Sequence, residues 1–296
     1  MKLTTSKLTS ALLKLAGKQY RPDASIDYSK RDLTDENFLD NNVKGLSFYQ
    51  SDLTGVDFTH ATATQCLFDE AIMVGAVLDN ADCTGSSFEK IKAKNLTLKN
   101  TNLTDTAFYQ VRLMCIDFGA AVMHKTAFRA SDLSHSDLSK IDIAKCDFSI
   151  TRLNGCNLTG LDLSDCSFNV VKFIAANMDD VTLSGAYFNT VNFDNALLTN
   201  TDCQNTTFDH CSLEHTIASN SNFEGSKFIK SNLEWVDFTN SNLRGVDFSG
   251  SSVDGADFEG ADLTGANFTG VFAESLKLSD EQKSVVIGLH PCWQAG

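Results

Sequence analysis

The chain has 296 residues and a formal net charge of -14 at pH 7, from 24 Lys and Arg against 38 Asp and Glu. This balance argues against a protein that binds nucleic acid by neutralising phosphates, because that mode needs a basic surface. Nine cysteines without regular spacing argue against a small disulfide-stapled secreted domain. No apolar run approaches the ~18–20 residues that cross a bilayer, so we expect no membrane span.

The first segment, residues 1–25, is predicted to be an N-terminal cap. Leu8, Leu12 and Leu15 fall at helical spacing, which indicates a short helix. Lysines interrupt its apolar stretch, so the pattern does not predict a cleaved export signal. We therefore expect a cytoplasmic protein, and secretion through a non-cleaved N-terminal signal stays open.

A five-residue repeat occupies residues 26–270 and reads Ala-Asp-Phe-Glu-Gly, then Ala-Asp-Leu-Thr-Gly, near its end. We call the third residue of each such unit its centre. The centres run from Tyr28 to Phe268 in one phase, which makes 49 units without an insertion. A period of five matches neither an α-helix nor a flat strand. It suits a solenoid whose chain turns a corner after each short side.

This pattern of a small residue, Asp or Asn, Leu or Phe, a polar residue and often Gly resembles the pentapeptide-repeat family. The resemblance implies an all-β fold: a right-handed quadrilateral β-helix solenoid with four units in each turn. For this chain it implies about twelve turns, with short terminal capping helices. Four units per turn would stack centres that lie 20 residues apart. One such column is Tyr28 followed only by Phe, from Phe48 to Phe268, so we predict an interior filled by stacked side chains.

The last segment, residues 271–296, is predicted to be a C-terminal capping or dimerisation helix. Ser279 and Gln282 have the spacing of a capping box. The apolar residues that follow are expected to lie on the same helix, which Pro291 ends. They either cap the open end of the coil or form a homodimer contact, as in several members of the family; these residues are Val285, Val286 and Leu289.

The sequence contains no nucleophile elbow, phosphate-binding loop or dinucleotide fingerprint. His210, Cys211 and His215 superficially resemble a metal site. The repeat phase, however, puts the two histidines at corners on different sides and points the cysteine inward. We expect no enzymatic activity, no metal and no cofactor.

Charge is distributed unevenly around the predicted coil. The side with centres from Phe38 to Phe258 is acidic and predicts a surface for a basic partner, formed by Asp57, Asp117, Asp137, Asp179, Asp237 and Asp257. The alternative is solubility alone, because the repeat itself favours Asp or Asn before each centre. The adjacent side carries a basic band that could recruit an acidic partner surface: Lys92, Lys94, Arg112, Arg152 and Lys172.

These features predict a non-catalytic protein-binding scaffold that does not bind nucleic acid directly. The resemblance to quinolone-resistance members of the family, which are acidic and bind gyrase, favours a mimic of duplex DNA that binds a type II topoisomerase. Many of those members carry projecting loops, whereas this chain has none between residues 26 and 268, as in the loop-free members. Two alternatives stay open: a secreted bacterial effector or adaptor that docks a protein partner, and a structural spacer.

Overall fold

The computed structural model describes residues 27–143 and 145–290. The chain divides into two compact units. Unit 1 comprises Met1–Leu133 and Lys140–Asp147, and unit 2 comprises Ser134–Ser139 and Phe148–Gly296.

Each unit is a β-helix whose chain turns a corner every five residues. At most corners the second residue after a centre adopts a left-handed backbone, with φ from 48° at Lys230 to 75° at Gly265. The amide three residues after a centre donates to the carbonyl of that centre, as Asn41 does to Phe38 at 3.0 Å, which closes a β-turn. Because the isolated β-bridges all join residues 20 positions apart, four corners complete one coil. The predicted all-β, four-sided solenoid is confirmed.

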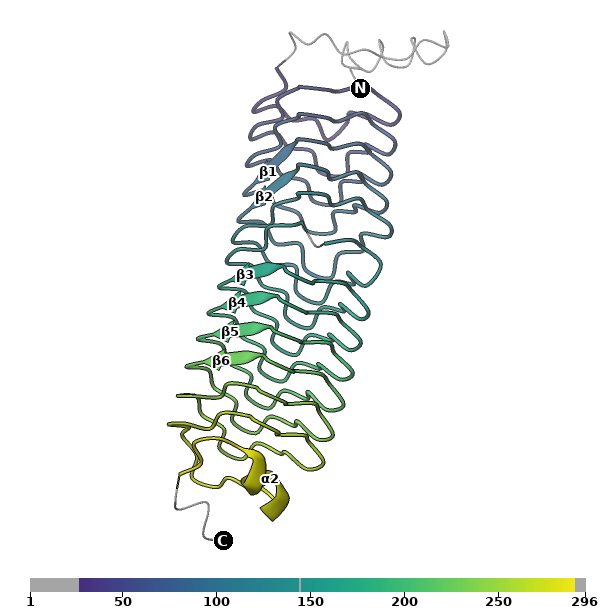
Figure 1. Cartoon of the computed structure of the whole chain (residues 1–296). Helices are drawn as coiled ribbons and strands as arrows, with labels where there is room; N and C mark the ends of the chain where they lie inside the picture. Colours follow the sequence, from purple (N-terminus) through teal and green to yellow (C-terminus); the bar gives the residue numbers. More distant parts are fainter. Residues whose placement is uncertain (1–26, 144, 291–296) are drawn as a thin grey trace. The chain divides into compact units, whose positions relative to one another are not determined.

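Unit 1 contains two short strands, β1 (Ser87–Glu89) and β2 (Ala107–Tyr109). They lie on consecutive coils (Figure 1) and pair in parallel, with Phe88 opposite Phe108. Elsewhere in the unit single β-bridges replace strands, because only the residues around each centre are extended before the next turn begins.

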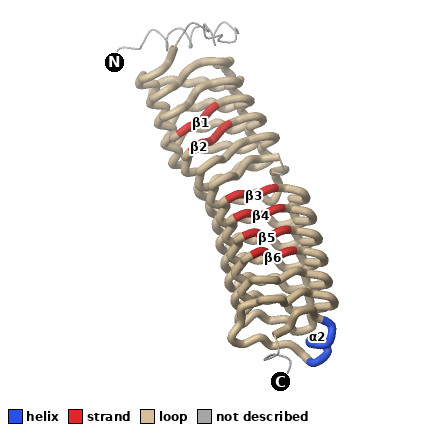
Figure 2. The backbone as a smooth tube through the Cα atoms, turned by 60° about the vertical axis from the view of Figure 1, so that its left-hand side comes forward, coloured by secondary structure: helices blue, strands red, loops and turns tan. Residues whose placement is uncertain are grey.

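Unit 2 contains four parallel strands in chain order: β3 (Ser167–Asn169), β4 (Tyr187–Asn189), β5 (Thr207–Asp209) and β6 (Lys227–Ile229). Figure 2 shows them in succession on neighbouring coils. A short helix, α2 (Asp280–Val285), follows the coil. No helix among the described residues is long and apolar enough to cross a membrane.

The core of each unit contains a column of stacked phenylalanine rings. In unit 1 the ring of Phe108 lies between its neighbours in the column, with ring centroids 4.8 Å from Phe88 and 5.0 Å from Phe128. In unit 2 the centroid of Phe208 lies 4.7 Å from that of Phe228. Phe108 and Phe208 are fully buried. The predicted stacking is confirmed in both columns.

Small hydroxyl side chains find hydrogen-bond partners in backbone carbonyls inside the coil. The hydroxyl of Thr101 donates to the carbonyl of Leu78 at 2.9 Å, and that of Thr206 donates to the carbonyl of Leu183 at 2.7 Å. Buried polar groups need such partners, because an unpaired one costs about 1–3 kcal/mol. Within the described residues, the buried hydroxyl of Thr97 has no hydrogen-bond partner.

The C-terminal segment differs from its prediction, while the N-terminal prediction (residues 1–25) falls outside the described residues. Ser279 caps α2 in a complete capping box with Gln282, as predicted. The helix, however, ends at Val285 and does not extend through Leu289. Ile287 instead joins the coil, donating to Ala266 at 2.8 Å and accepting from Phe268 at 2.7 Å. The last coil offers unpaired backbone groups at its edge, and β-branched residues favour extended backbone over helix.

The three apolar residues predicted as a cap or dimer contact therefore do not share a helical face. Leu289, two residues after Ile287, is buried. Val286 is half-buried, and Val285 is exposed at the end of α2. The segment closes the end of the coil by backbone pairing and by burial of Leu289.

Candidate functional site

The aspartates that precede the centres are held by their own turns. In each case one carboxylate oxygen accepts the amide two residues later, at 2.8 to 3.0 Å, in Asp57, Asp117, Asp137, Asp237 and Asp257. This Asx-type hydrogen bond gives the repeat's preference for Asp or Asn a structural cause. It also fixes the direction of each carboxylate relative to the backbone.

Asp179 follows a centre and is held differently. Its Oδ1 accepts the amide of Thr199, which lies on the next coil, at 3.1 Å. The carboxylate therefore braces two consecutive coils of unit 2.

In unit 1 the structure does not bring Asp57 and Asp117 together. The ladder from Asp57 continues through Val77 and Thr97, which carry no charge. The ammonium group of Lys99 lies 2.9 Å from Asp117. Hydrogen bonds from that ammonium and from the Gly119 amide lower the pKa of Asp117, and the lysine also neutralises its charge. The predicted acidic surface is therefore not continuous in this unit.

In unit 2 the ladder beginning at Asp137 is interrupted before it becomes acidic again. Two asparagines follow, and then the apolar Leu197 and Ile217. Asp237 and Asp257 come next and bridge each other on neighbouring coils. Of the six predicted aspartates, these two alone are joined by a β-bridge. They form the acidic pair considered below.

The predicted basic band is also assembled only in part. In unit 2 Arg152 and Lys172 bridge each other on neighbouring coils. In unit 1 Lys92 bridges Ile72 and Arg112 bridges Asp132, and these two basic residues, which lie 20 positions apart, are not joined to each other by a β-bridge. Lys94 is exposed one position after the centre that follows Lys92. All five basic side chains of the prediction are exposed.

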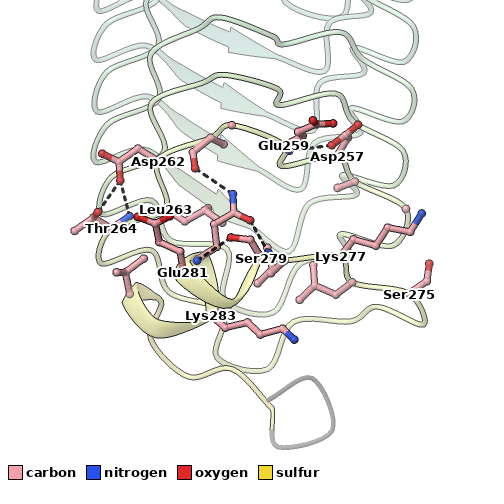
Figure 3. A pocket seen from close by; sticks show the side chains of 18 of the residues that line it. Asp257, Glu259, Asp262, Leu263, Thr264, Ser275, Lys277, Ser279, Glu281 and Lys283 are labelled. Carbon is pink, nitrogen blue, oxygen red and sulfur yellow. Dashed lines mark hydrogen bonds between the residues drawn. The ribbon is translucent and has the colours of Figure 1, made fainter. Parts of the chain in front are cut away.

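A groove of about 1400 Å³ lies at the C-terminal end of unit 2. The last coils form one part of it and the segment from Ser275 to Val285 forms the other. Figure 3 shows Asp257 and Glu259 close together on one side of the groove and Asp262 with Thr264 on the opposite side. The sequence prediction missed this groove, because it exists only where the chain leaves the coil and returns.

Gln282 fixes the segment that forms the groove. Its amide group donates to the carbonyl of Phe258 at 2.7 Å and to that of Ala261 at 3.1 Å. Its side-chain oxygen accepts a hydrogen bond from the backbone amide of Ser279 at 3.0 Å. The backbone amide of Gln282 in turn donates to the Ser279 hydroxyl at 3.1 Å. One residue thus caps the helix and donates to two carbonyls at the end of the coil, of which that of Phe258 also accepts the turn amide of Ala261.

The charges lining the groove are mostly negative. Asp262 accepts from Thr264 and from Arg244, whose guanidinium lies 3.0 Å away. These hydrogen bonds, led by the Thr264 hydroxyl, lower the pKa of Asp262 to about 2. Lys283 lies 3.8 Å from Asp280. The groove keeps three further carboxylates, Asp257, Glu259 and Glu281, against the single further amine of Lys277.

No metal site appears among the described residues, since no group of three His, Cys, Asp or Glu side chains could hold an ion there. The three residues that superficially resemble a metal site in the sequence do not form one in the structure. His210 contacts Asp209 at 2.6 Å, His215 lies 3.6 Å from Glu214, and Cys211 is buried. Burial raises the pKa of the Cys211 thiol to about 12, which disfavours the thiolate that binds metals.

Comparison with known protein families gives matches over most of the repeat. A model described as "Pentapeptide repeat region" matches residues 198–268, and "Pentapeptide repeats (9 copies)" matches residues 153–197. A third, "Pentapeptide repeats (8 copies)", matches residues 51–92 and 131–169. Together these matches cover more than half of the chain. A search of curated proteins gave no match.

Similar solved structures share little sequence identity with this chain. HetL, a pentapeptide repeat protein involved in heterocyst differentiation regulation in the cyanobacterium Nostoc sp. strain PCC 7120, is 16% identical. The alignment covers 90% of this chain and 97% of HetL, with a TM-score of 0.30. QnrB1, a plasmid-mediated fluoroquinolone resistance protein, is 12% identical over 79% of this chain and 94% of QnrB1, with a TM-score of 0.28.

Proposed function

The chain belongs to the pentapeptide-repeat family, and on that premise we propose that it is a non-catalytic scaffold that binds a protein partner through the outer surface of its coils. The filled interior supports this proposal. Stacked phenylalanine rings such as Phe108 and Phe208 occupy the space that a substrate would need. The groups available for recognition are therefore on the surface.

The acidic pair Asp237 and Asp257 is the observation that carries the proposal for the partner. Each carboxylate is held by the amide two residues on, at 2.9 Å in both cases. Because they lie on bridged coils, they are separated by about the strand spacing of ~4.8 Å. Two carboxylates fixed before binding lose little conformational freedom when a cation meets them.

The partner that we propose is the basic DNA-binding groove of a type II topoisomerase such as gyrase, which this protein enters as a mimic of duplex DNA. A net charge of -14 supports an electrostatic encounter with such a groove. The resemblance of the repeat to quinolone-resistance members supports the same partner. Gyrase acts in the bacterial cytoplasm, so the proposal requires this protein to be there.

A gyrase supercoiling titration, with and without a fluoroquinolone, tests the proposal. We expect the wild-type protein to inhibit supercoiling or to protect the enzyme from the drug. The double variant Asp237→Asn with Asp257→Asn should lose this effect. Asparagine can still accept the turn hydrogen bond, as Asn242 does from the backbone amide of Arg244, so we expect the fold to be kept.

The matched control removes two charges elsewhere without changing the turns. Asp52 and Asp82 accept the amides of Thr54 and Thr84 in the same way, but lie on other sides of the coil in unit 1. The double variant Asp52→Asn with Asp82→Asn should behave like the wild type. Equal loss in both double variants would reduce the effect to net charge and contradict a defined surface. No effect of the wild type at micromolar concentration would remove the topoisomerase from consideration.

A further inference from the structure

Trp235 is an exposed aromatic residue in an unusual place. It occupies a corner of the coil with φ of 59°, a left-handed backbone that bulky residues adopt rarely. The equivalent corner carries Asn195 two coils earlier and Gly255 one coil later. The indole stacks on the imidazole of His215, with centroids 6.3 Å apart and planes at 16°, yet 53% of the residue stays exposed.

The exposed part of Trp235 lines the C-terminal groove. The same groove is lined by Gly255, which lies directly against part of the indole, and by the acidic residues Asp257 and Glu259. Figure 3 shows these two carboxylates next to each other at the coil side of the groove. An aromatic wall beside carboxylates is complementary to a flat organic cation, because the ring face and the carboxylates both attract positive charge.

Further carboxylates flank the corner outside the groove. Glu214, Glu234, Asp254 and Glu274 occupy one position on successive coils, directly before the corner. Among the described residues no Lys or Arg forms an ion pair with any of the four. Amides of Ser275 and Glu274 donate to Asp254 and lower the pKa of its carboxyl group.

We propose that this groove receives an arginine side chain of the protein partner, with its guanidinium stacked on Trp235 and facing Asp257 and Glu259. The inference rests on the proposed protein-binding function and names the group of the partner that is anchored. A guanidinium fits better than an ammonium group, because it is planar, stacks on aromatic faces and binds carboxylates in a forked geometry. The ammonium group of Lys277, which also lines the groove, neither stacks on aromatic faces nor binds carboxylates in a forked geometry.

Calorimetric titration with short blocked peptides tests the assignment. The probes are the acetylated and amidated peptides Gly-Arg-Arg-Gly and Gly-Lys-Lys-Gly. We expect the wild-type protein to bind the arginine peptide more tightly than the lysine peptide. Trp235→Asn should lower the affinity for the arginine peptide about five- to tenfold and leave the affinity for the lysine peptide little changed. Asparagine suits this left-handed corner, since Asn195 adopts φ of 60° at the equivalent position.

A pair of charge variants separates the groove from general electrostatics. Glu259→Gln removes a groove carboxylate, and Glu224→Gln removes a carboxylate from the equivalent repeat position on another side of unit 2. Only Glu259→Gln should weaken the arginine peptide. Equal effects of the two variants, or unchanged binding in Trp235→Asn, would overturn the proposal. A dimer that depends on Trp235 in light scattering, without peptide binding, would assign the groove to a second copy of the chain instead.

The two proposals fail separately. If gyrase inhibition depends on Asp237 and Asp257 but Trp235→Asn binds the arginine peptide as the wild type does, only the arginine anchor is wrong. If the peptide results hold and gyrase is unaffected, the anchor stands and serves another basic partner.

Discussion

The indole of Trp235 occupies the space in which a side chain at Gly255 would lie. A Cβ atom added to Gly255 would be only 2.6 Å from Cδ2 of that indole. The contact joins two consecutive coils at one corner. It also explains how the C-terminal groove acquires an aromatic wall, since any side chain on the later coil would push the ring away.

Gly255→Ala should therefore displace the indole and destabilise unit 2. Gly245→Ala is the matched control, because Gly245 has a similar φ of 63° against 65° but nothing within 4 Å of its added Cβ. The left-handed backbone alone costs about 1 kcal/mol in each variant. We expect Gly255→Ala to lose about 1–2 kcal/mol more through the clash, measured by urea unfolding. Equal losses would show that the indole moves aside without cost.

Thr97→Val should stabilise unit 1 by up to about 1 kcal/mol. Valine has nearly the same shape as threonine, and the change removes a buried hydroxyl that has no partner in the described structure. Thr101→Val is the opposite case, because the hydroxyl of Thr101 donates to the Leu78 carbonyl. That variant should lose about 1 kcal/mol. Urea midpoints that shift in the same direction for both variants would contradict this reasoning.

Asp262 should make the protein more stable above pH 4 than near pH 2. Its pKa in the folded protein is about 2, below the ordinary value of 3.8, because Thr264 and Arg244 donate to the ionised form. The ionised carboxylate therefore favours the folded state. Its contribution is complete above the unfolded pKa and is lost as pH falls through the folded one.

Urea unfolding at several pH values between these limits measures that contribution. Asp262→Asn should flatten the acid part of the stability curve, since asparagine accepts the turn hydrogen bond without titrating. Arg244→Gln should give an intermediate curve, because the Thr264 hydrogen bonds remain. If Asp262→Asn shows the same dependence of stability on pH as the wild type, other carboxylates account for all of that dependence.

Gln282→Met should loosen the end of the coil. Methionine fills a similar volume but removes the printed donor to the Ala261 carbonyl and one of two donors to the Phe258 carbonyl, which keeps the turn amide of Ala261. We expect a cost of about 1–3 kcal/mol. Gln282→Glu keeps an acceptor for the Ser279 amide and removes the same donor, so it separates helix capping from coil closure. Hydrogen exchange at the Ile287 amide should be faster in both variants. If Gln282→Glu exchanges like the wild type, capping alone holds the segment.

The regular part of this fold could be predicted from sequence because its contacts repeat. A period of five with a column of Phe every 20 residues predicts which side chains stack, and Phe108 and Phe208 do so. The same rule accounts for the Asx hydrogen bonds of Asp57 and Asp237, because each involves only the residue two positions later.

The irregular part could not be predicted in the same way. Ile287 returns to the coil because a free backbone edge competes with helix extension, and helix motifs do not describe that competition. The groove beside Trp235 depends on this return. The acidic surface was overestimated for another reason: summing charge over one side ignores the ladder, in which Leu197 and Ile217 separate Asp137 from Asp237.

The pairing of each residue in unit 2 with the residue 20 positions later also limits how the gene for this chain could gain or lose repeats. If the unit 241–245 were deleted, Val253 would take the place over Phe228 that Phe248 now holds. Asp262 would likewise replace Asp257 beside Asp237. Every later surface would rotate by a quarter turn. Removal of four units at once would leave each column intact, so duplications and deletions that preserve the binding surface come in whole coils.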